Sequence, residues 1–157
     1  MTIRAATPAD LAFVRALAAR EFAAFGDYGR IVDEWLAHDG LLTFVADGDG
    51  GPVGFTMVGF YRLEEATTPQ PYAADLLAIA VSPSVQRRGV GRALLEHAVA
   101  TARAARRRLP VRELRLSVAD TNTRARRMFA AAGFVEEPGD HGLYDGGQRA
   151  LHMVRVL

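Results

Sequence analysis

The stretch from Leu76 to Ala105 constrains the fold of this chain more than any other, because a strand leads through a glycine turn directly into a helix. Leu76 to Val81 is an unbroken apolar run, typical of a strand that is buried on both faces. From Val90 onward, apolar residues recur with the period of a helix. Gly89 and Gly91 lie where a sharply turning backbone benefits from a missing side chain. A chain with this stretch is neither all-helical nor all-β.

The turn before this helix has the chemistry of an anion site. The N–H groups of a first helical turn have no partner within the helix and attract negative charge. Arg87, Arg88 and Arg92 add positive charge, and Gln86 adds a neutral donor. The spacing matches neither the G-x-G-x-x-G dinucleotide fingerprint nor the P-loop, whose lysine is missing from the whole chain. A tight connection that simply needs glycine is the alternative.

Strands and helices alternate along the rest of the chain. Apolar runs predict strands over residues 2–4, 41–46, 53–61, 75–81, 113–118, 134–137 and 150–156. Helical periodicity predicts helices that begin at Thr7-Pro8, before Ile31, at Val90 and near Asn122. We therefore expect an α/β (α+β) fold in a single domain over residues 1–157, with a mixed, mostly antiparallel sheet of about seven strands flanked by about four helices.

Local signals set the expected ends of these elements. The glycine-rich segment from Asp47 to Pro52 predicts the turn of a hairpin. Gly133 is expected to stop the helix that begins near Asn122. Arg106-Arg107-Arg108 is expected to form the last turn of the long helix, because positive charge favours the carbonyl end of a helix. We prefer this interpretation of the arginine run to phosphate binding.

Composition limits the chemistry and the partners. Half of the residues are hydrophobic and 24% are charged, which is typical of a folded globular protein. The chain has no cysteine, so disulfides, thiol nucleophiles and thiolate metal sites are excluded, and we expect no metal. All basic side chains are arginine, which excludes lysine Schiff bases. A net charge of +1 argues against a nucleic-acid partner. We expect no membrane association, a cytoplasmic location, and a monomer or homodimer, since no signal-peptide pattern or spanning apolar run is present.

Two motifs, in this order along the chain, resemble those of a known superfamily. Gln86-x-x-Gly89-x-Gly91 after Val81-x-Pro83 resembles the pyrophosphate-binding motif of the GNAT superfamily of acyl-CoA-dependent N-acyltransferases. The segment from Asn122 to Phe134 is similar to the superfamily's N-x-x-A-x-x-x-Y-x-x-x-G-F pattern. The resemblance spans essentially the whole chain. Within the superfamily, residues 77–97 and 144–153 are most similar to enzymes that acetylate protein N-terminal amines, including ribosomal-protein alanine acetyltransferases.

The resemblance implies a cofactor, a reaction and a set of binding residues. Acetyl-CoA would lie where the strands over residues 75–81 and 113–118 splay apart, and its acetyl group would move directly to a primary amine of a small molecule or a peptide N-terminus. Backbone groups of Ile79, Ala80 and Val81 would pair with the pantetheine arm. The implied pyrophosphate, arm and sulfur contacts come from Gln86, Arg87, Arg88, Gly89, Val90, Gly91, Arg92, Asn122 and Phe129.

The chain departs from the superfamily at both usual proton carriers. Phe129 replaces the tyrosine that donates a proton, and Ser117 stands where the N-terminal acetyltransferases have a glutamate base. We therefore predict that Tyr144 and Ser117 handle protons, although a Tyr144 ring packed under a loop is an alternative. His141, Asp75 and Glu34 are further candidates, whereas His97 and His152 are interpreted as structural.

The acceptor side is the least diagnostic part of the chain. The first two helices and the loops over residues 62–72 and 137–147 are expected to shape it. Aromatic residues there either line a pocket or, as we prefer, belong to the core: Phe25, Tyr28, Trp35, Tyr61, Tyr72 and Tyr144. A non-catalytic acyl-CoA-binding sensor that has lost the proton carriers is the alternative to an enzyme.

Overall fold

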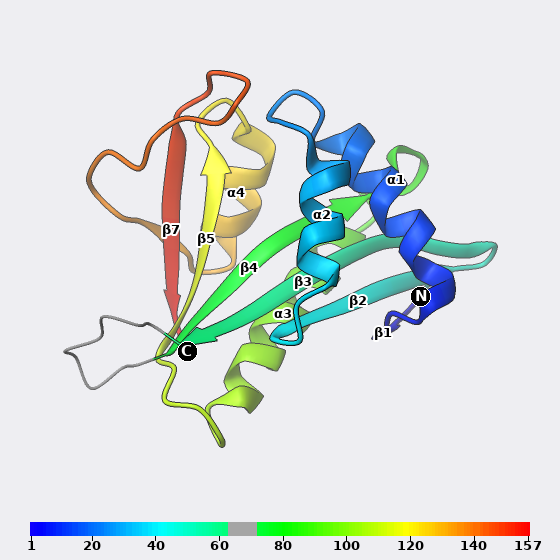
Figure 1. Ribbon diagram of the computed structural model, residues 1–157, viewed down its shortest axis with the longest axis horizontal. Coiled ribbons are helices and arrows are strands. Elements are labelled where there is room, and N and C mark those ends of the chain that lie inside the picture. The colour runs from blue at the N-terminus through cyan, green and yellow to red at the C-terminus, as the bar shows by residue number, and fades with distance from the viewer. Residues whose placement is uncertain (63–71) are drawn as a thin grey trace.

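A seven-stranded sheet in the order β1-β2-β3-β4-β5-β7-β6 runs through the molecule (Figure 1). The structure is a computed structural model that describes residues 1–62 and 72–157. Neighbouring strands are antiparallel except β4 and β5, which are parallel. The predicted mixed, mostly antiparallel sheet is therefore confirmed. The strands are β1 (Thr2–Ala5), β2 (Leu41–Gly48), β3 (Gly51–Arg62), β4 (Tyr72–Val81), β5 (Glu113–Ala119), β6 (Val135–Glu136) and β7 (Ala150–Val156).

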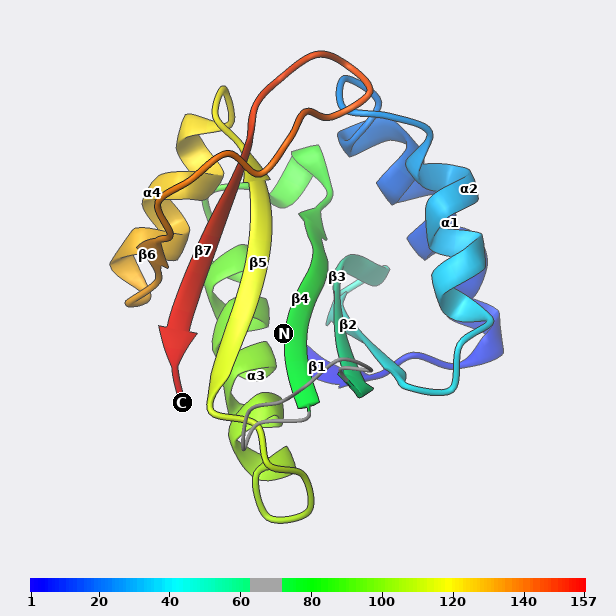
Figure 2. The same ribbon diagram turned by 60° about the vertical axis from the view of Figure 1, so that its left-hand side comes forward.

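Helices cover both faces of the sheet (Figure 2). On one face, α3 and α4 pack against β4 and β5 around Leu95, Leu114 and Phe129. On the other face, α1 and α2 cover β3 and β4 around Leu17 and Phe55. The α-helices are α1 (Leu11–Glu21), α2 (Tyr28–Leu36), α3 (Val90–Ala105) and α4 (Thr123–Ala131), with 3-10 turns at η1 (Pro8–Asp10) and η2 (Pro83–Val85).

Several predicted boundaries were wrong by a few residues. The hairpin turn is confined to Asp49 and Gly50, because β2 and β3 keep pairing to Gly48 and Gly51 across a bulge. The first helical turn is a 3-10 turn, so α1 begins at Leu11. Arg106 to Arg108 follow the end of α3 as a turn instead of forming its last helical turn.

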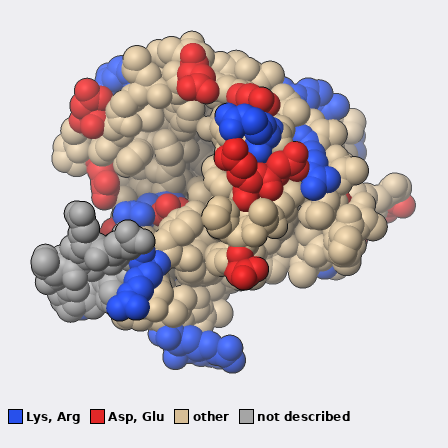
Figure 3. All heavy atoms as spheres, viewed as in Figure 1, with Lys and Arg blue, Asp and Glu red and all other residues tan. Residues whose placement is uncertain are grey.

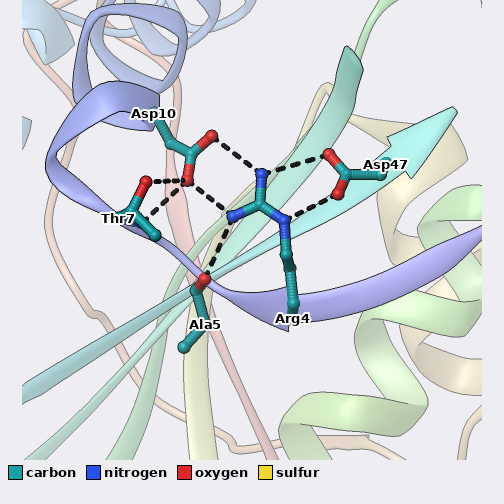
Figure 4. A network of polar contacts seen from close by, with 5 residues as sticks. All are labelled: Arg4, Ala5, Thr7, Asp10 and Asp47. Atoms are coloured by element: carbon teal, nitrogen blue, oxygen red, sulfur yellow. Dashed lines mark hydrogen bonds and ion pairs between the residues drawn. The ribbon is translucent and has the colours of Figure 1, made fainter. Parts of the chain in front are cut away.

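An ion-pair network ties the first strand to its neighbours (Figure 4). The Arg4 guanidinium donates to both carboxylate oxygens of Asp10 at 2.7 and 3.0 Å and to both of Asp47 at 2.6 and 3.2 Å. The Asp10 carboxylate also accepts from the Thr7 backbone N–H at 2.7 Å. Hydrogen bonds from Arg4 hold the pKa of this buried carboxyl well below its usual value. The network fixes β1, η1 and β2 relative to one another.

The parallel strands β4 and β5 separate soon after they meet. Their paired residues are only Ala74 with Leu114, Asp75 with Arg115, and Leu76 with Leu116. Leu77 is an extra residue opposite β3, because Met57 pairs with Ala78 and Val58 with Leu76. Such a bulge bends its strand, while β5 stays paired with β7 along its whole length. The two strands consequently diverge toward their carboxyl ends, as Figure 1 shows.

Candidate active site

A cleft of about 640 Å³ begins where β4 and β5 diverge. The β4 residues Ile79, Ala80 and Val81 line one wall, and Thr121 and Asn122, between β5 and α4, line another. Beyond Leu76 the β5-facing edge of β4 has no strand partner among the described residues, so its backbone groups are open to a ligand. The predicted splay between these strands is confirmed.

The glycine turn forms the far end of this cleft. Arg87 and Gly89 have φ angles of +68° and +84°, which reverse the chain just before α3. The first recorded bond of α3 joins the Ala93 N–H to the Gly89 carbonyl at 3.0 Å, so the amides of the first turn have no acceptor within the helix. Successive free N–H groups in such a turn make an anion-binding concavity. Gln86, Arg87, Gly89, Gly91 and Arg92 line the cleft.

Gln86 connects three elements beside the turn. Its Nε2 donates to the Val81 carbonyl at 3.0 Å and lies 3.4 Å from the Glu21 carboxylate of α1, while its Oε1 accepts from Arg124 of α4 at 2.9 Å. Arg124 also lines the cleft. The wall contributed by Glu21 and Phe22 was not predicted, because it depends on how α1 packs and has no local sequence signal. Phe25, a candidate for an acceptor pocket, also lines this cleft.

A narrow chamber of about 80 Å³ follows the cleft between the diverging strands. Ile79 and Asn122 line both spaces, so the chamber adjoins the cleft. Phe129, only 4% exposed, packs on Phe134 and forms part of the chamber wall. Asn122 accepts from the Ala125 N–H at 3.3 Å and so also caps α4. The chamber is mostly apolar, as an acetyl group and a sulfur atom require.

Ser117 and Tyr144, predicted from sequence as proton carriers, meet at this chamber. Their hydroxyl oxygens are 3.0 Å apart, although 27 positions separate the residues in the chain. The Tyr144 ring also packs on Phe25 with a centroid separation of 5.6 Å. Burial raises the pKa of Tyr144 above its usual value, whereas the hydrogen bond with Ser117 acts in the opposite direction. The phenol therefore stays protonated at neutral pH and can donate.

A polar pocket of about 310 Å³ lies on the other side of Tyr144. Ser117, Tyr144 and Leu77 line both this pocket and the chamber, so the two adjoin. On the floor of this pocket, the Asp75 carboxylate accepts a hydrogen bond from Arg115 Nε at 3.0 Å. Figure 3 shows this face of the molecule as a hollow beside α2, with red and blue atoms together at its lower edge. Glu137, His152, Tyr28 and Trp35 complete the charged and aromatic lining.

Some candidate site residues contribute no side chain to these spaces. Val90 is buried against Ala46 and Leu94, so only its backbone is near the turn, and Arg88 does not line the cleft. Glu34, a further candidate base, pairs with Arg30 at 2.8 Å and lines none of the described pockets.

The aromatic residues divide between pocket and core. Phe25 and Tyr144 line the chamber. Tyr28 and Trp35 line the polar pocket but also pack against the core on the α1–α2 face, so the preferred core interpretation holds in part for these two. Tyr61 and Tyr72 line none of the described pockets. The predicted loop over 62–72 falls, for residues 63–71, outside the described residues.

The loop between β6 and β7 reaches across to the α1–α2 connection. The Gly146 N–H donates to the Phe25 carbonyl at 3.3 Å, and the Gln148 Nε2 donates to the Ala24 carbonyl at 3.0 Å. Figure 2 shows the two segments meeting at the end of the sheet where β4 and β5 are apart. Tyr144 is held in the turn of this loop, because its N–H donates to the Gln148 carbonyl at 2.8 Å.

Comparisons with known proteins agree with this geometry. The chain matches the model of the Acetyltransferase (GNAT) family over residues 11–134. A ribosomal-protein-alanine N-acetyltransferase from Brucella melitensis is 24% identical, with 100% of each chain covered and a TM-score of 0.78. The ribosomal-protein-S18-alanine N-acetyltransferase from Escherichia coli is 24% identical, with 99% of this chain and 92% of that chain covered and a TM-score of 0.73.

A structure with bound ligand has the same fold. Arabidopsis thaliana NAA60 in complex with acetyl-CoA is 15% identical, with 99% of this chain and 98% of that chain covered and a TM-score of 0.77. No curated protein sequence matches the chain.

Because the family model covers most of its length, the chain belongs to the GNAT acetyltransferase family. It is an N-acetyltransferase, and acetyl-CoA is its cosubstrate. The described residues fit this cosubstrate, since a cleft with free amides at one end leads into an apolar chamber at the other. In the described part of the chain, no helix has both the length and the apolar character needed to cross a membrane.

Proposed function

We propose that this enzyme transfers the acetyl group of acetyl-CoA directly to a primary amine, either of a small molecule or of a peptide N-terminus. The observation that carries the proposal is the unbroken series of adjoining spaces: the cleft, the chamber and the polar pocket share lining residues, and Ser117 and Tyr144 lie where the last two meet. Acetyl-CoA supplies an acetyl thioester and would enter through the cleft. The amine would enter through the polar pocket.

The binding roles follow from the donors at each point of the cleft. The amides from Arg87 to Arg92 would hold the diphosphate at the start of α3, with the Gln86 and Arg124 side chains beside it. The free edge of β4 over Ile79, Ala80 and Val81 would pair with the pantetheine arm as an added strand would. Asn122 would contact the arm, and Phe129 would contact the sulfur.

Tyr144 would donate the proton that the departing thiolate needs. The Tyr144 side chain lines the chamber, and its hydroxyl oxygen lies 3.0 Å from that of Ser117. The raised pKa of Tyr144 favours the protonated form of the phenol. Ser117 would orient this hydroxyl. No covalent enzyme intermediate is required, because the chain has no cysteine and direct attack by the amine suffices.

The polar pocket presents both negatively and positively charged side chains to an acceptor amine. Asp75 and Glu137 carry negative charge and Arg115 carries positive charge, while Tyr28 and Trp35 form aromatic walls. An ammonium group next to carboxylates and aromatic faces is favourable. Both a small amine and the first residue of a peptide satisfy this chemistry.

The proposal is tested by mixing the protein with acetyl-CoA and measuring release of the CoA thiol with four classes of amine: peptides, polyamines, aminoglycosides and amino acids. We expect protein-dependent release with at least one class. Calorimetry with acetyl-CoA alone runs in parallel. Binding of acetyl-CoA without release in any class would contradict the proposal and favour the sensor alternative.

A further inference from the structure

We propose that the imidazole of His152 is a further catalytic residue, which removes the proton from the acceptor ammonium in the polar pocket. This inference rests on the proposed function and names a group for a step that Tyr144 and Ser117 do not perform. A thiolate needs a proton, whereas an ammonium must lose one before its nitrogen can attack. The two steps therefore need groups of opposite character.

The position of His152 follows from strand register. His152 in β7 pairs directly with Ser117 in β5, and side chains of directly opposite residues project from the same face of the sheet. Ser117 is in turn 3.0 Å from the Tyr144 hydroxyl. All three side chains line the polar pocket. The imidazole thus lies one cross-strand position from the point where the pocket meets the chamber.

Several charged and titratable groups face His152 from every element packed around it. His141, in the loop after β6, stacks on the imidazole with a centroid separation of 3.9 Å and an interplanar angle of 19°. Glu137, at the start of that loop, donates its backbone N–H to the His152 carbonyl at 2.8 Å. Asp75 of β4 and Arg115 of β5 form their ion pair on the pocket floor, and the Tyr144 phenol lies across it.

The balance of these neighbours favours a neutral imidazole. Burial lowers the pKa of His152, His141 and Arg115 lower it further, and Glu137 and Asp75 oppose them. A histidine with a lowered pKa is mostly unprotonated at neutral pH and can accept a proton. The nearby carboxylates then stabilise the imidazolium that forms.

The other basic groups of the pocket are less suited to the step. The Asp75 carboxylate is already engaged by Arg115. Glu137 is exposed to solvent. His141 does not line the pocket. His152 combines a place in the pocket with a base of the right strength.

Protons and electrons balance in the resulting sequence. The acceptor R–NH3⁺ transfers one proton to a ring nitrogen of His152, which becomes imidazolium. The freed nitrogen lone pair forms a bond to the acetyl carbon, and the bond from that carbon to sulfur breaks with its electron pair going to sulfur. Tyr144 protonates the sulfur and is reprotonated by the second proton that leaves the nitrogen. His152 then returns its proton to water through the open pocket.

The experiment uses ethylamine as the probe, since it is small enough for the pocket and almost fully ammonium at neutral pH. Release of CoA from acetyl-CoA is measured against pH for the wild type and for His152→Gln, His141→Ala and His38→Gln, and the ring pKa of His152 is followed by NMR. His38 is exposed, lies after α2 and lines no described pocket, so His38→Gln is the matched control.

The expected results separate a base from a structural histidine. In the wild type, kcat/KM should fall at low pH with the ring pKa of His152. His152→Gln should lower kcat/KM by about 10²-fold at neutral pH and remove this acidic limb, with acetyl-CoA affinity unchanged. His141→Ala should raise the ring pKa of His152 and move the limb to higher pH, because a neighbour that lowers this pKa is gone. His38→Gln should match the wild type.

Two other patterns would overturn the inference. If kcat/KM of His152→Gln still falls at low pH as it does in the wild type, whatever the rate of the variant, then a group other than His152 causes the fall. A ring pKa at or above that of an ordinary histidine shows that the imidazole is not poised as a base. A wild type that binds acetyl-CoA but never releases CoA with ethylamine or any other amine would instead refute the proposed function, and the role of His152 with it.

Discussion

At the scale of single residues, one contact bears on both departures from the superfamily motif. Phe129 cannot donate a proton and Ser117 is a poor base, so both usual carriers are absent. The Ser117 hydroxyl instead lies 3.0 Å from that of Tyr144, which comes from a different loop. In the proposed mechanism the β6–β7 loop supplies the donor, at the chamber that Phe129 also lines.

Replacement of Tyr144 by phenylalanine tests this assignment. Tyr144→Phe should lower kcat by about 10²-fold, because the thiolate loses its proton donor, while the ring still packs on Phe25. Ser117→Ala should have a smaller effect, since Ser117 only orients the phenol. Steady-state kinetics with the best amine of the panel measure both. Equal rates for Tyr144→Phe and the wild type would exclude Tyr144 as the donor.

Gly89 tests the anion site through its backbone. Its φ is +84° and a Cβ would meet no atom within 4 Å, so Gly89→Ala strains the turn without a clash. Strain of about 1–2 kcal/mol should shift the turn and weaken acetyl-CoA binding by about tenfold. Gly142→Ala is the matched control, with φ of +88° and equally open space at a position of the β6–β7 loop that lines none of the described pockets. Calorimetry that gives both variants the same affinity for acetyl-CoA would contradict this role.

At the scale of elements, sequence patterns predicted the order of strands and helices, and the resemblance to the superfamily implied the two strands that splay. The signal was strong because the apolar run of β4, the turn and the amphipathic α3 are adjacent in sequence. Boundaries were less accurate, since the extra pairs at the ends of β2, β3 and β4 depend on partner strands. The short β6 was overestimated because apolar Val135 is 69% exposed at the sheet edge.

The contact between the β6–β7 loop and the α1–α2 connection is tested at Gly146. A Cβ there would lie 2.0 Å from the Ala24 carbonyl oxygen, so Gly146→Ala must push the two segments apart. Hydrogen exchange should then increase in both residues 22–27 and residues 142–149. Gly147→Ala is the control, because it strains the same loop at φ of +92° with no neighbour within 4 Å. If exchange at residues 22–27 rose equally in both variants, the contact would not hold the segments together.

Because of the ion-pair network around Arg4, the free energy of unfolding should depend on pH. The pKa of Asp10 is lower in the folded protein than in the unfolded chain, so the unfolded state binds more protons as pH falls. The carboxylate therefore stabilises the fold above its ordinary pKa of 3.8, and this contribution is lost as pH drops toward the lower folded value. Asp10→Asn should lose stability less steeply between about pH 6 and about pH 3 than the wild type. Urea unfolding at each pH measures the slope, and identical slopes would refute the assignment.

At the scale of the whole molecule, the proposed function assigns the two substrates to different spaces. The cofactor cleft opens at the carboxyl ends of β4 and β5 beside α3 and α4, whereas the polar pocket lies on the face that α2 only partly covers (Figure 3). Sequence motifs identified the first because a diphosphate imposes a local pattern. The second is assembled from β4, β5, β7, α2 and the β6–β7 loop, so residues such as His152 carried no sequence signal beyond their alternation in a strand.

The measurement that most directly tests this account is titration of the isotope-labelled protein with acetyl-CoA, followed through its backbone amide resonances. The largest changes should occur at the amides of residues 87–92, with a second group along the free edge of β4 from Leu77 to Val81. Saturable binding that leaves both groups unchanged, or no binding at all, would contradict the assignment of this cleft to acetyl-CoA.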